Sequence, residues 1–162
     1  MKSLLFSIIL LSSVCGVGQV TSSKFDSLPI TTGLPVEVNG LQITPPAGYA
    51  YLPNIHSFIN HLSQTSISIQ KDSARSLDSF IPYLENEYKN TKGTTELLGY
   101  EKLDTGYLVT FAMDIQGIPI ERVMYIFQNK GVMISVMANY KQQSKDKHRN
   151  ILVKAITSVK PI

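Results

Sequence analysis

The stretch "IPIERVMYIFQNKGVMISVMANY", from Ile118 to Tyr140, decides the fold because it reads as two long strands joined by a turn. The strands are "IPIERVMYIF" and "VMISVMANY", and "QNKG" between them contains a glycine, which readily adopts the positive φ of tight turns. Apolar side chains occur at both the odd and the even positions of these strands. Successive strand residues point to opposite faces, so both faces of this hairpin are apolar. A sheet with two apolar faces needs cover on both sides.

The sequence before this hairpin extends it into a sheet. The strand "YLVTFAMD" and the turn segments "LDTG" and "IQGI" predict a four-stranded antiparallel meander from Thr95 to Tyr140. Turns at Gln116-Gly117 and at 128–131 fix which side chains share a face. One face then carries Val109, Phe111, Met113, Ile120, Met124, Ile126, Met133 and Met137, and the other carries Val123, Tyr125, Phe127, Val132, Ile134 and Val136.

Two amphipathic helices supply the cover. "SLDSFIPYLENEYKN" has apolar residues at the 3.6-residue period of a helix, and the segment from Ser144 to Val159 repeats that pattern. The first stripe is Leu77, Phe80, Ile81, Leu84 and Tyr88, and the second is Ile151, Leu152, Ala155, Ile156 and Val159. We therefore expect an α+β protein, an α/β/α sandwich whose central antiparallel sheet is covered by a helix from the N-terminal half and a C-terminal helix.

Pro82 lies inside the first helical pattern and allows two interpretations. If the helix begins near Asp78 or Ser79, the proline falls in the first turn, where amide hydrogens have no intrahelical partner. If the helix begins earlier, the proline is an interior residue and produces a kink on the solvent side.

The N-terminal half contains shorter strand signals. Val36 and Val38 are separated from Leu41 and Ile43 by Asn39-Gly40, a pair favoured in tight hairpin turns. The segment "TSISIQKD" alternates apolar and polar residues as a half-buried strand does. Residues 19–34 are rich in Ser, Thr and Pro, which predicts a flexible lead-in before a domain at 35–162.

Residues 1–18 have the layout of a secretory signal peptide. A basic start at Lys2 is followed by an apolar run of roughly a dozen residues, too short to cross a membrane as a helix, which takes about 20. Gly16 and Gly18 fit a cleavage before Gln19. We therefore expect an exported protein, periplasmic or secreted, with no membrane span.

The single cysteine, Cys15, has two interpretations. Cleavage before Gln19 removes it with the signal. Alternatively, Ser12, Ser13, Val14 and Cys15 resemble a bacterial lipobox, in which case Cys15 is lipidated and anchors the protein to the envelope. The lipobox leucine is missing here, and Val14 is larger than the pattern prefers.

Composition excludes some classes of function. The 162 residues carry 15 Lys and Arg against 12 Asp and Glu, a formal charge of +3 that falls to +2 if Lys2 is removed. Nucleic-acid binding needs a concentrated basic stripe, so we expect no nucleic-acid partner. The most basic run, "KQQSKDKHR" at 141–149, is typical of one solvated helix face.

No catalytic or metal motif is present. His56 and His61 are five residues apart, which suits neither a helix nor a strand as a metal site. There is no Gly-x-Ser-x-Gly elbow. Asp114, Glu121 and Arg122 form the best polar cluster, which we interpret as charges that keep a hairpin end soluble. We expect no catalytic residue, no bound metal and no cofactor.

Two further groups could bind a partner. The four methionines on the predicted strands could line a soft copper site or a plastic groove, but core filling is favoured in the absence of His or Cys on those strands. The loop "PPAGYAYLPNIHSF" offers Tyr49, Tyr51 and Phe58 as a partner-binding surface. The alternative for these rings is that they seal the end of the sandwich.

The order of elements resembles the PsbP-like superfamily, which includes the bacterial DcrB-like proteins. The resemblance rests on "PPAGY" (Pro45 to Tyr49), "SISIQK", "SLDSFIPYLENEY", the long-stranded meander and a closing helix that runs into "ITSVK" (Ile156 to Lys160). It extends from about Val36 to the end, although many relatives have tryptophan where this chain has Tyr49. It implies exported or membrane-facing domains that bind or assemble other proteins, and it implies no shared catalytic residues.

Two hypotheses for function follow. The first is an exported, non-enzymatic binding or assembly-factor domain of the bacterial envelope whose partner is an envelope or secreted protein. The second is a small extracytoplasmic hydrolase or ligand-binding enzyme, with a site in a pocket between a helix and the sheet. Fold alone does not decide between them.

Overall fold

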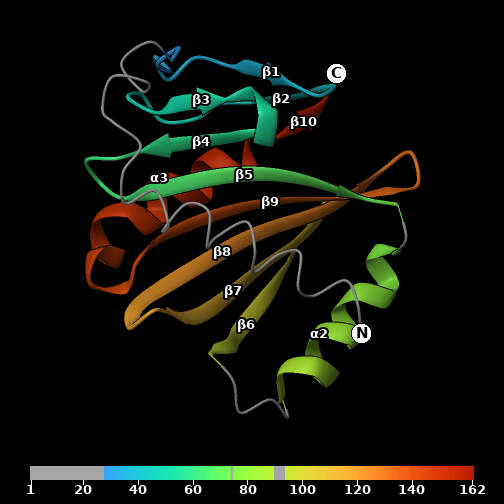
Figure 1. Ribbon diagram of the computed structural model, residues 1–162. Helices are drawn as coiled ribbons and strands as arrows, with labels where there is room; N and C mark the ends of the chain where they lie inside the picture. The colour runs from blue at the N-terminus through green and yellow to red at the C-terminus, as the bar shows by residue number, and fades with distance from the viewer. Residues whose placement is uncertain (1–27, 74, 90–93) are drawn as a thin grey trace.

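The computed structural model describes residues 28–73, 75–89 and 94–162, which form two sheets and two α-helices. The large sheet has seven antiparallel strands in the order β3-β4-β5-β9-β8-β7-β6, and the small sheet has the order β1-β2-β10 (Figure 1). The strands of the large sheet are β3 (Ala50–Leu52), β4 (Ser57–Asn60), β5 (Thr65–Asp72), β6 (Thr95–Leu103), β7 (Gly106–Ile115), β8 (Ile118–Asn129) and β9 (Val132–Lys141). The remaining elements are β1 (Val36–Val38), β2 (Leu41–Ile43), the 3-10 helices η2 (Pro53–Ile55) and η3 (Gln142–Ser144), α2 (Leu77–Lys89), α3 (Lys145–Thr157) and β10 (Lys160–Pro161).

The meander predicted between Thr95 and Tyr140 is present as β6 to β9. Gln116-Gly117 and Lys130-Gly131 both have positive φ, between 50° and 80°, which is the geometry of tight hairpin turns whose twist matches that of the strands. The second turn is shorter than the expected 128–131, because Gln128 and Asn129 continue β8 and pair with β9. The paired strands therefore extend further than the turn signal indicated.

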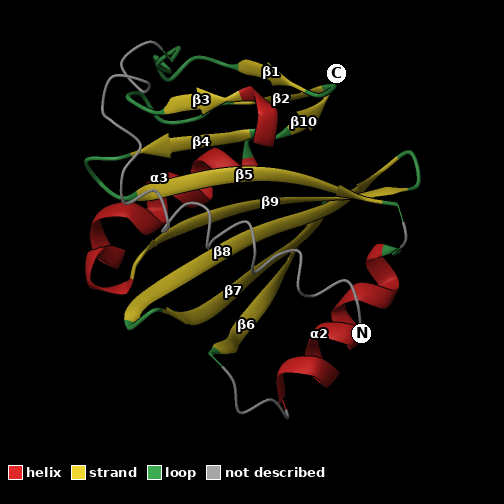
Figure 2. Ribbon diagram, in the orientation of Figure 1, coloured by secondary structure: helices red, strands yellow, loops and turns green. Residues whose placement is uncertain are grey.

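The two helices cover opposite faces of the large sheet, which confirms the α/β/α sandwich (Figure 2). α2 packs Phe80, Ile81 and Leu84 against one face, and α3 packs Leu152, Ala155 and Ile156 against the other. The predicted division of side chains between the faces is confirmed as well. The α2 cluster contains Val109, Phe111, Met124, Ile126, Met133 and Met137, and the α3 cluster contains Val123, Tyr125, Phe127, Ile134 and Val136.

The hairpin around Asn39-Gly40 forms as predicted, but it belongs to the small sheet. β2 pairs with β1 on one side and with the C-terminal strand β10 on the other. Val38, Leu41 and Ile43 of this sheet are buried in the same cluster as α3. The small sheet therefore helps α3 to close one side of the molecule, an arrangement that the strand pattern alone did not indicate.

Pro82 is an interior residue of α2, because the helix begins at Leu77. Ser76 precedes the helix, and its Oγ accepts a hydrogen bond from the Ser79 amide at 3.3 Å. The proline is exposed, so its missing amide hydrogen lies on the solvent side of the helix. Of the two interpretations of Pro82, the interior position is the one observed.

Residues 28–34, at the end of the expected lead-in, are tied to the domain. The Thr31 amide donates to the Tyr49 carbonyl at 2.8 Å, and the Tyr51 amide donates to the Pro29 carbonyl at 3.1 Å. Ile30 forms an isolated bridge with Ala50, and Thr31 is buried. This segment therefore covers the outer edge of β3.

Candidate functional site

The aromatic residues proposed as a partner-binding surface are mostly inside the protein. Tyr49 is 5% exposed and Phe58 is fully buried, whereas Tyr51 is half-buried. The Tyr49 hydroxyl lies 2.5 Å from Oγ1 of Thr65, and the rings of Tyr51 and Phe58 are 4.8 Å apart. The expected exposure of Tyr49 and Phe58 is therefore wrong, because residues 28–34 and the neighbouring strands enclose this loop.

Within the described chain, the histidines do not gather into a metal site. His56 follows η2 with a left-handed backbone at φ 47°, and His61 is exposed in the turn between β4 and β5. No group of three His, Cys, Asp or Glu residues suited to a metal ion occurs within residues 28–73, 75–89 and 94–162. Cys15 lies outside the described residues, so its lipidation stays a prediction.

The methionines of the meander fill the core beneath α2. Met124, Met133 and Met137 are buried in the α2 cluster, and Met113 packs against it from its edge. Thioether side chains fill irregular gaps well because they are unbranched and polarizable. The favoured interpretation of these residues as core filling is confirmed.

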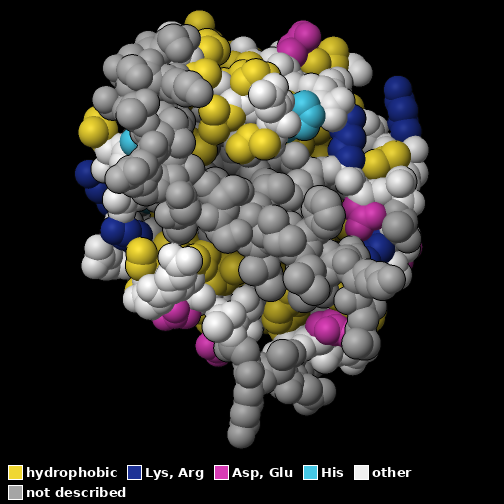
Figure 3. All heavy atoms as spheres, viewed as in Figure 1, with side chains coloured by type: hydrophobic (Ala, Val, Ile, Leu, Met, Phe, Trp, Pro, Cys, Tyr) yellow, Lys and Arg dark blue, Asp and Glu magenta, His cyan; other side chains and the backbone are white. Residues whose placement is uncertain are grey.

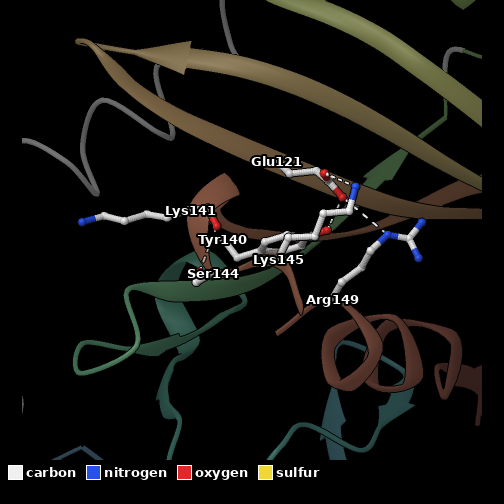
Figure 4. Close-up of polar contacts among 6 residues, drawn as sticks. All are labelled: Glu121, Tyr140, Lys141, Ser144, Lys145 and Arg149. Atoms are coloured by element: carbon white, nitrogen blue, oxygen red, sulfur yellow. Dashed lines mark hydrogen bonds and ion pairs between the residues drawn. The ribbon is translucent and has the colours of Figure 1, made fainter. Parts of the chain in front are cut away.

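A buried carboxylate lies at the centre of a polar cluster between β8 and α3. Glu121 of β8 is 1% exposed and faces α3, where Lys145 Nζ lies 2.9 Å from Oε2 and Arg149 Nε lies 3.4 Å from Oε1 (Figure 4). The Tyr140 hydroxyl donates a hydrogen bond to Oε1. The Lys145 contact is an ion pair, and Oε2 accepts no hydrogen bond from the described residues. Lys141, one residue beyond Tyr140, points away from the cluster.

The Glu121 cluster fastens the first two turns of α3 to the sheet. Burial raises the pKa of the Tyr140 hydroxyl, and the bond to Glu121 raises it further, so Tyr140 remains a neutral donor at physiological pH. Two cations and one hydroxyl surround the carboxylate, and it is 1% exposed, so it is out of reach of a substrate in solvent. The chemistry of this cluster is that of a structural ion pair.

The next residue, Arg122, builds a second polar cluster on the opposite face. Its Nε donates to Asn139 Oδ1 at 2.8 Å, and Asn139 Nδ2 donates to Ser66 Oγ at 3.1 Å. Arg122 is 8% exposed, and burial lowers the pKa of its guanidinium to about 10. At neutral pH the Arg122 side chain is therefore still a cation. Asn139, which accepts its hydrogen bond, and Ser66, which accepts from Asn139, are both neutral.

The interpretation of Asp114, Glu121 and Arg122 as solubilising charges at a hairpin end is wrong for two of the three. Only Asp114 is exposed, where its Oδ1 accepts a hydrogen bond from the Gly117 amide at 2.8 Å. Glu121 and Arg122 are buried on opposite faces because successive strand residues alternate. A signal for this was present in the sequence, since the pair stands inside a strand predicted to be covered on both sides.

On the face shown in Figure 3, the charged side chains of the described residues form no single patch. In the view of Figure 3 the basic and acidic side chains of the described residues are dispersed around the rim. Large exposed apolar side chains include Leu62, which is 99% exposed, and Ile151, which is 52% exposed. Isolated apolar side chains of this kind are common on protein surfaces. Within the described residues, neither α-helix has the length and apolar character needed to cross a membrane.

No family model matches the sequence, and no curated protein matches it. Solved structures match the fold at low sequence identity. The cyanobacterial PsbP (CyanoP) of Synechocystis sp. PCC 6803 aligns with a TM-score of 0.59 and 11% identity, covering 84% of this chain and 96% of its own. The Ran-binding protein Mog1p of Saccharomyces cerevisiae aligns with a TM-score of 0.55 and 9% identity, covering 83% of this chain and 96% of its own.

A third match comes from a mycobacterial protein. LpqN, involved in cell envelope biogenesis of Mycobacterium tuberculosis, aligns with a TM-score of 0.51 and 10% identity, covering 87% of this chain and 96% of its own. Together these matches show that the chain has the PsbP-like fold. The identities are too low to carry over any residue's role.

Proposed function

We propose that this chain is an exported, non-enzymatic binding or assembly domain of the bacterial cell envelope. The observation that carries the proposal is the fold, because its structural neighbours include a Ran-binding protein and a protein of cell envelope biogenesis. Binding is therefore the kind of activity that this fold is known to support. The inference is one of fold-level analogy, and it gains weight from two independent features of the chain.

The first feature is the state of the buried charges. An enzyme that uses acid–base chemistry keeps a titratable group within reach of its substrate. Glu121, the fully buried carboxylate among the described residues, is instead occupied by Lys145, Arg149 and the Tyr140 hydroxyl. This arrangement favours a structural role over a catalytic one.

The second feature is the N-terminal sequence. Residues 1–18 have the layout of a secretory signal, and Cys15 is a candidate lipidation site. Export would place the domain among envelope or secreted proteins, where its partner is to be sought. The intact mass of the protein from its host envelope tests this step: a start at Gln19 or an acylated Cys15 supports export, and an uncut Met1 terminus in the cytoplasm contradicts it.

Binding is tested by photo-crosslinking in living cells. A photoreactive amino acid replaces Leu62 or Ile151 in separate variants, since both side chains project into solvent, one from the turn between β4 and β5 and the other from α3. Replacing buried Leu152 serves as the matched control, because its side chain faces the sheet. We expect one envelope protein to be captured from a surface position, and captured less when unlabelled domain is added in excess.

Two results would contradict the proposal. The first is the absence of any competable crosslink from a set of probes spread over the whole surface. The second is turnover: saturable hydrolysis of model esters or phosphates by the purified chain would favour the small-hydrolase alternative. The enzyme assay needs no partner, so it separates the two functions directly.

A further inference from the structure

The charges of the described residues are divided unevenly along the chain. Residues 141–162, which form η3, α3 and β10, carry six Lys and Arg and one acidic residue, Asp146. The described residues before them carry six Lys and Arg against ten Asp and Glu. The C-terminal segment is therefore strongly cationic, whereas the remainder of the described chain is anionic.

This division separates the two helical layers of the sandwich. α3 carries four Lys and Arg against one acidic residue, and α2 carries three acidic residues against one lysine. The two helices cover opposite faces of the large sheet (Figure 2). The molecule is thus polarised across its thickness, with a cationic helix on one side and an anionic helix on the other. Such a charge distribution orients a protein in front of a charged surface.

Two of the four cations of α3 are directed at the sheet and two are directed at solvent. Lys145 and Arg149 pair with the buried Glu121. Lys147 and Lys154 are exposed, and neither makes an ion pair with another described residue. Because successive helix residues are rotated by about 100°, these two lysines lie within about 20° of each other around the helix axis. They form a cationic row on the side of α3 that faces away from the sheet.

An exposed apolar side chain lies between these two lysines. Ile151 is four residues after Lys147 and three before Lys154, a spacing that places all three on one side of the helix. The Ile151 side chain is 52% exposed. A lone exposed isoleucine is ordinary on a protein surface. An apolar residue flanked by lysines on the outward side of a helix is instead typical of helices that lie flat on a membrane surface.

We propose that the outer face of α3 docks on an anionic phospholipid bilayer, with Lys147 and Lys154 at the headgroups and Ile151 inserted between them. Lysine suits this role because its compact ammonium attracts headgroups without requiring a fixed geometry. Two-point recognition of a single carboxylate or phosphate on a protein partner calls for arginine instead. The arginine of α3, Arg149, is held by Glu121 on the packing face.

The opposite layer of the molecule favours the same orientation. The anionic helix α2 lies on the far side of the sheet from α3, so it is turned away from the bilayer that α3 contacts. Contact through α3 needs no protein partner and no lipid on Cys15. The inference therefore goes beyond the proposed function and does not depend on it.

Binding of this kind is weak and sensitive to salt. Each Lys or Arg close to an anionic bilayer strengthens binding by about fivefold. The attraction extends over a Debye length of about 8 Å at physiological ionic strength, and added salt shortens that reach. We therefore expect low salt to favour the docked state and high salt to release the protein from the bilayer.

The experiment places an environment-sensitive fluorophore on the full chain, in which Cys15→Ser leaves a single engineered thiol. Ile151→Cys carries the label at the proposed contact. Leu98→Cys carries it on β6 as the matched control, since the exposed fraction of Leu98 is similar at 47%. The probes are vesicles of phosphatidylcholine alone and vesicles of phosphatidylcholine and phosphatidylglycerol in equal parts.

We expect a saturable blue shift of the label at position 151 with the anionic vesicles, reversed by added salt. Neutral vesicles should give no shift, and the label at position 98 should respond to neither kind of vesicle. The label reports its own surroundings, so contact between the apolar residues 1–18 and the vesicles does not by itself produce this signal.

Two double variants test whether the charges of α3 carry the binding. Lys147→Gln combined with Lys154→Gln should weaken binding to the anionic vesicles by about tenfold or more. Lys102→Gln combined with Lys130→Gln removes the same net charge from β6 and from the turn between β8 and β9, and should weaken binding by less than about twofold. All four lysines are exposed, so both double variants should remain folded.

Three results would overturn the inference. The first is a label at position 151 that fails to respond to anionic vesicles at low salt, or that responds equally to neutral ones. The second is equal weakening by the two double variants, which would mean that net charge rather than α3 drives binding. The third is a saturable response to soluble polyglutamate and none to vesicles, which would identify an acidic protein as the partner of this face.

Discussion

Glu121 and Arg122 are consecutive in the sequence, yet their charges are compensated in different ways. Glu121 faces α3 and meets Lys145, Arg149 and Tyr140. Arg122 faces the other way and meets the neutral Asn139. Alternation along a strand is enough to separate the two charges, so they cannot neutralise each other. The partners of each charged side chain are therefore set by the layer of the sandwich that it faces.

Replacing Glu121 with glutamine tests the fastening of α3. The change keeps the shape of the side chain but leaves two cations without their counter-charge. Lys145 and Arg149 are partly exposed, which reduces the effect. We expect a loss of about 1–3 kcal/mol in the free energy of unfolding, measured by urea denaturation. Glu101→Gln, on an exposed position of β6, is the matched control and should change stability by less than about 0.5 kcal/mol.

His148 gives a prediction for pH. Burial lowers the pKa of His148, and the charge of Lys147 lowers it further, so the folded protein prefers the neutral imidazole. The unfolded chain, with a pKa near 6.5, takes up the proton first as the pH falls. The contribution of neutral His148 to the free energy of unfolding is therefore fully present above the unfolded pKa. It is lost as the pH falls from 6.5 to the lower pKa of His148 in the folded protein. Unfolding titrations from pH 7.5 to 5 should show a shallower decline for His148→Gln, and identical curves would contradict this assignment.

At the scale of single elements, the sequence predicts the apolar stripe of α2 but leaves open where in the helix Pro82 lies. The stripe of Phe80, Ile81 and Leu84 faces the sheet as its spacing requires. Pro82 sits on the opposite, exposed side, in the second turn of the helix. There it lacks the amide hydrogen that would bond to the carbonyl four residues before it.

Pro82→Ala should therefore stabilise the protein. An interior proline costs about 3 kcal/mol relative to alanine, and the greater freedom of the unfolded alanine chain offsets up to about 1 kcal/mol. We expect a gain of about 1–2 kcal/mol in urea denaturation. Asn86→Ala, at an exposed position one turn later, controls for helix propensity and should gain less. A loss of stability in Pro82→Ala would mean that α2 requires the kink.

Sequence patterns predicted those elements whose side chains follow a local period. The alternation of Met124 and Ile126 against Val123 and Tyr125 assigned each to its cluster correctly, since both faces of the hairpin are covered. Burial of Glu121 was missed although its strand is predicted to be covered on both sides, because the cations of α3 that pair with the buried carboxylate have no local pattern in the sequence. Burial of Tyr49 was missed for a similar reason, because Thr31 covers it from a segment without strand periodicity.

At the scale of the whole molecule, the strand that follows α3 links this helix to the small sheet. β10 is only two residues long and pairs with β2 at Gln42 and Leu41, and the Ile162 amide donates to the Gly40 carbonyl. So short a strand, with a proline in it, has no strand signal in the sequence. The sandwich of layers was therefore predictable, while the small sheet that completes it was not.

Removal of residues 160–162 tests that coupling. The hairpin of β1 and β2 would lose its pairing on one side, whereas the core of α3 against β8 and β9 would be untouched. We expect amide hydrogen exchange to accelerate in Val36–Val38 and Leu41–Ile43 by at least tenfold, with unchanged protection in β8 and β9. Equal acceleration in β8 and β9 would show instead that the small sheet and the large sheet open as one cooperative unit.

The pairing of β5 with β9 has a consequence for the order of folding. Ser66 and Asn139 are hydrogen-bonded neighbours that lie 73 residues apart in the chain, with α2 and three strands between them. β6 to β9 can form by successive local hairpins, whereas β5 must close a long loop before it gains any contact. We expect the transition state to contain the meander without β5, so that Ile67→Val accelerates unfolding with little effect on the refolding rate, whereas Val123→Ala slows refolding. In the nascent chain, β3, β4 and β5 leave the ribosome before β9 and wait for it before they can join the sheet.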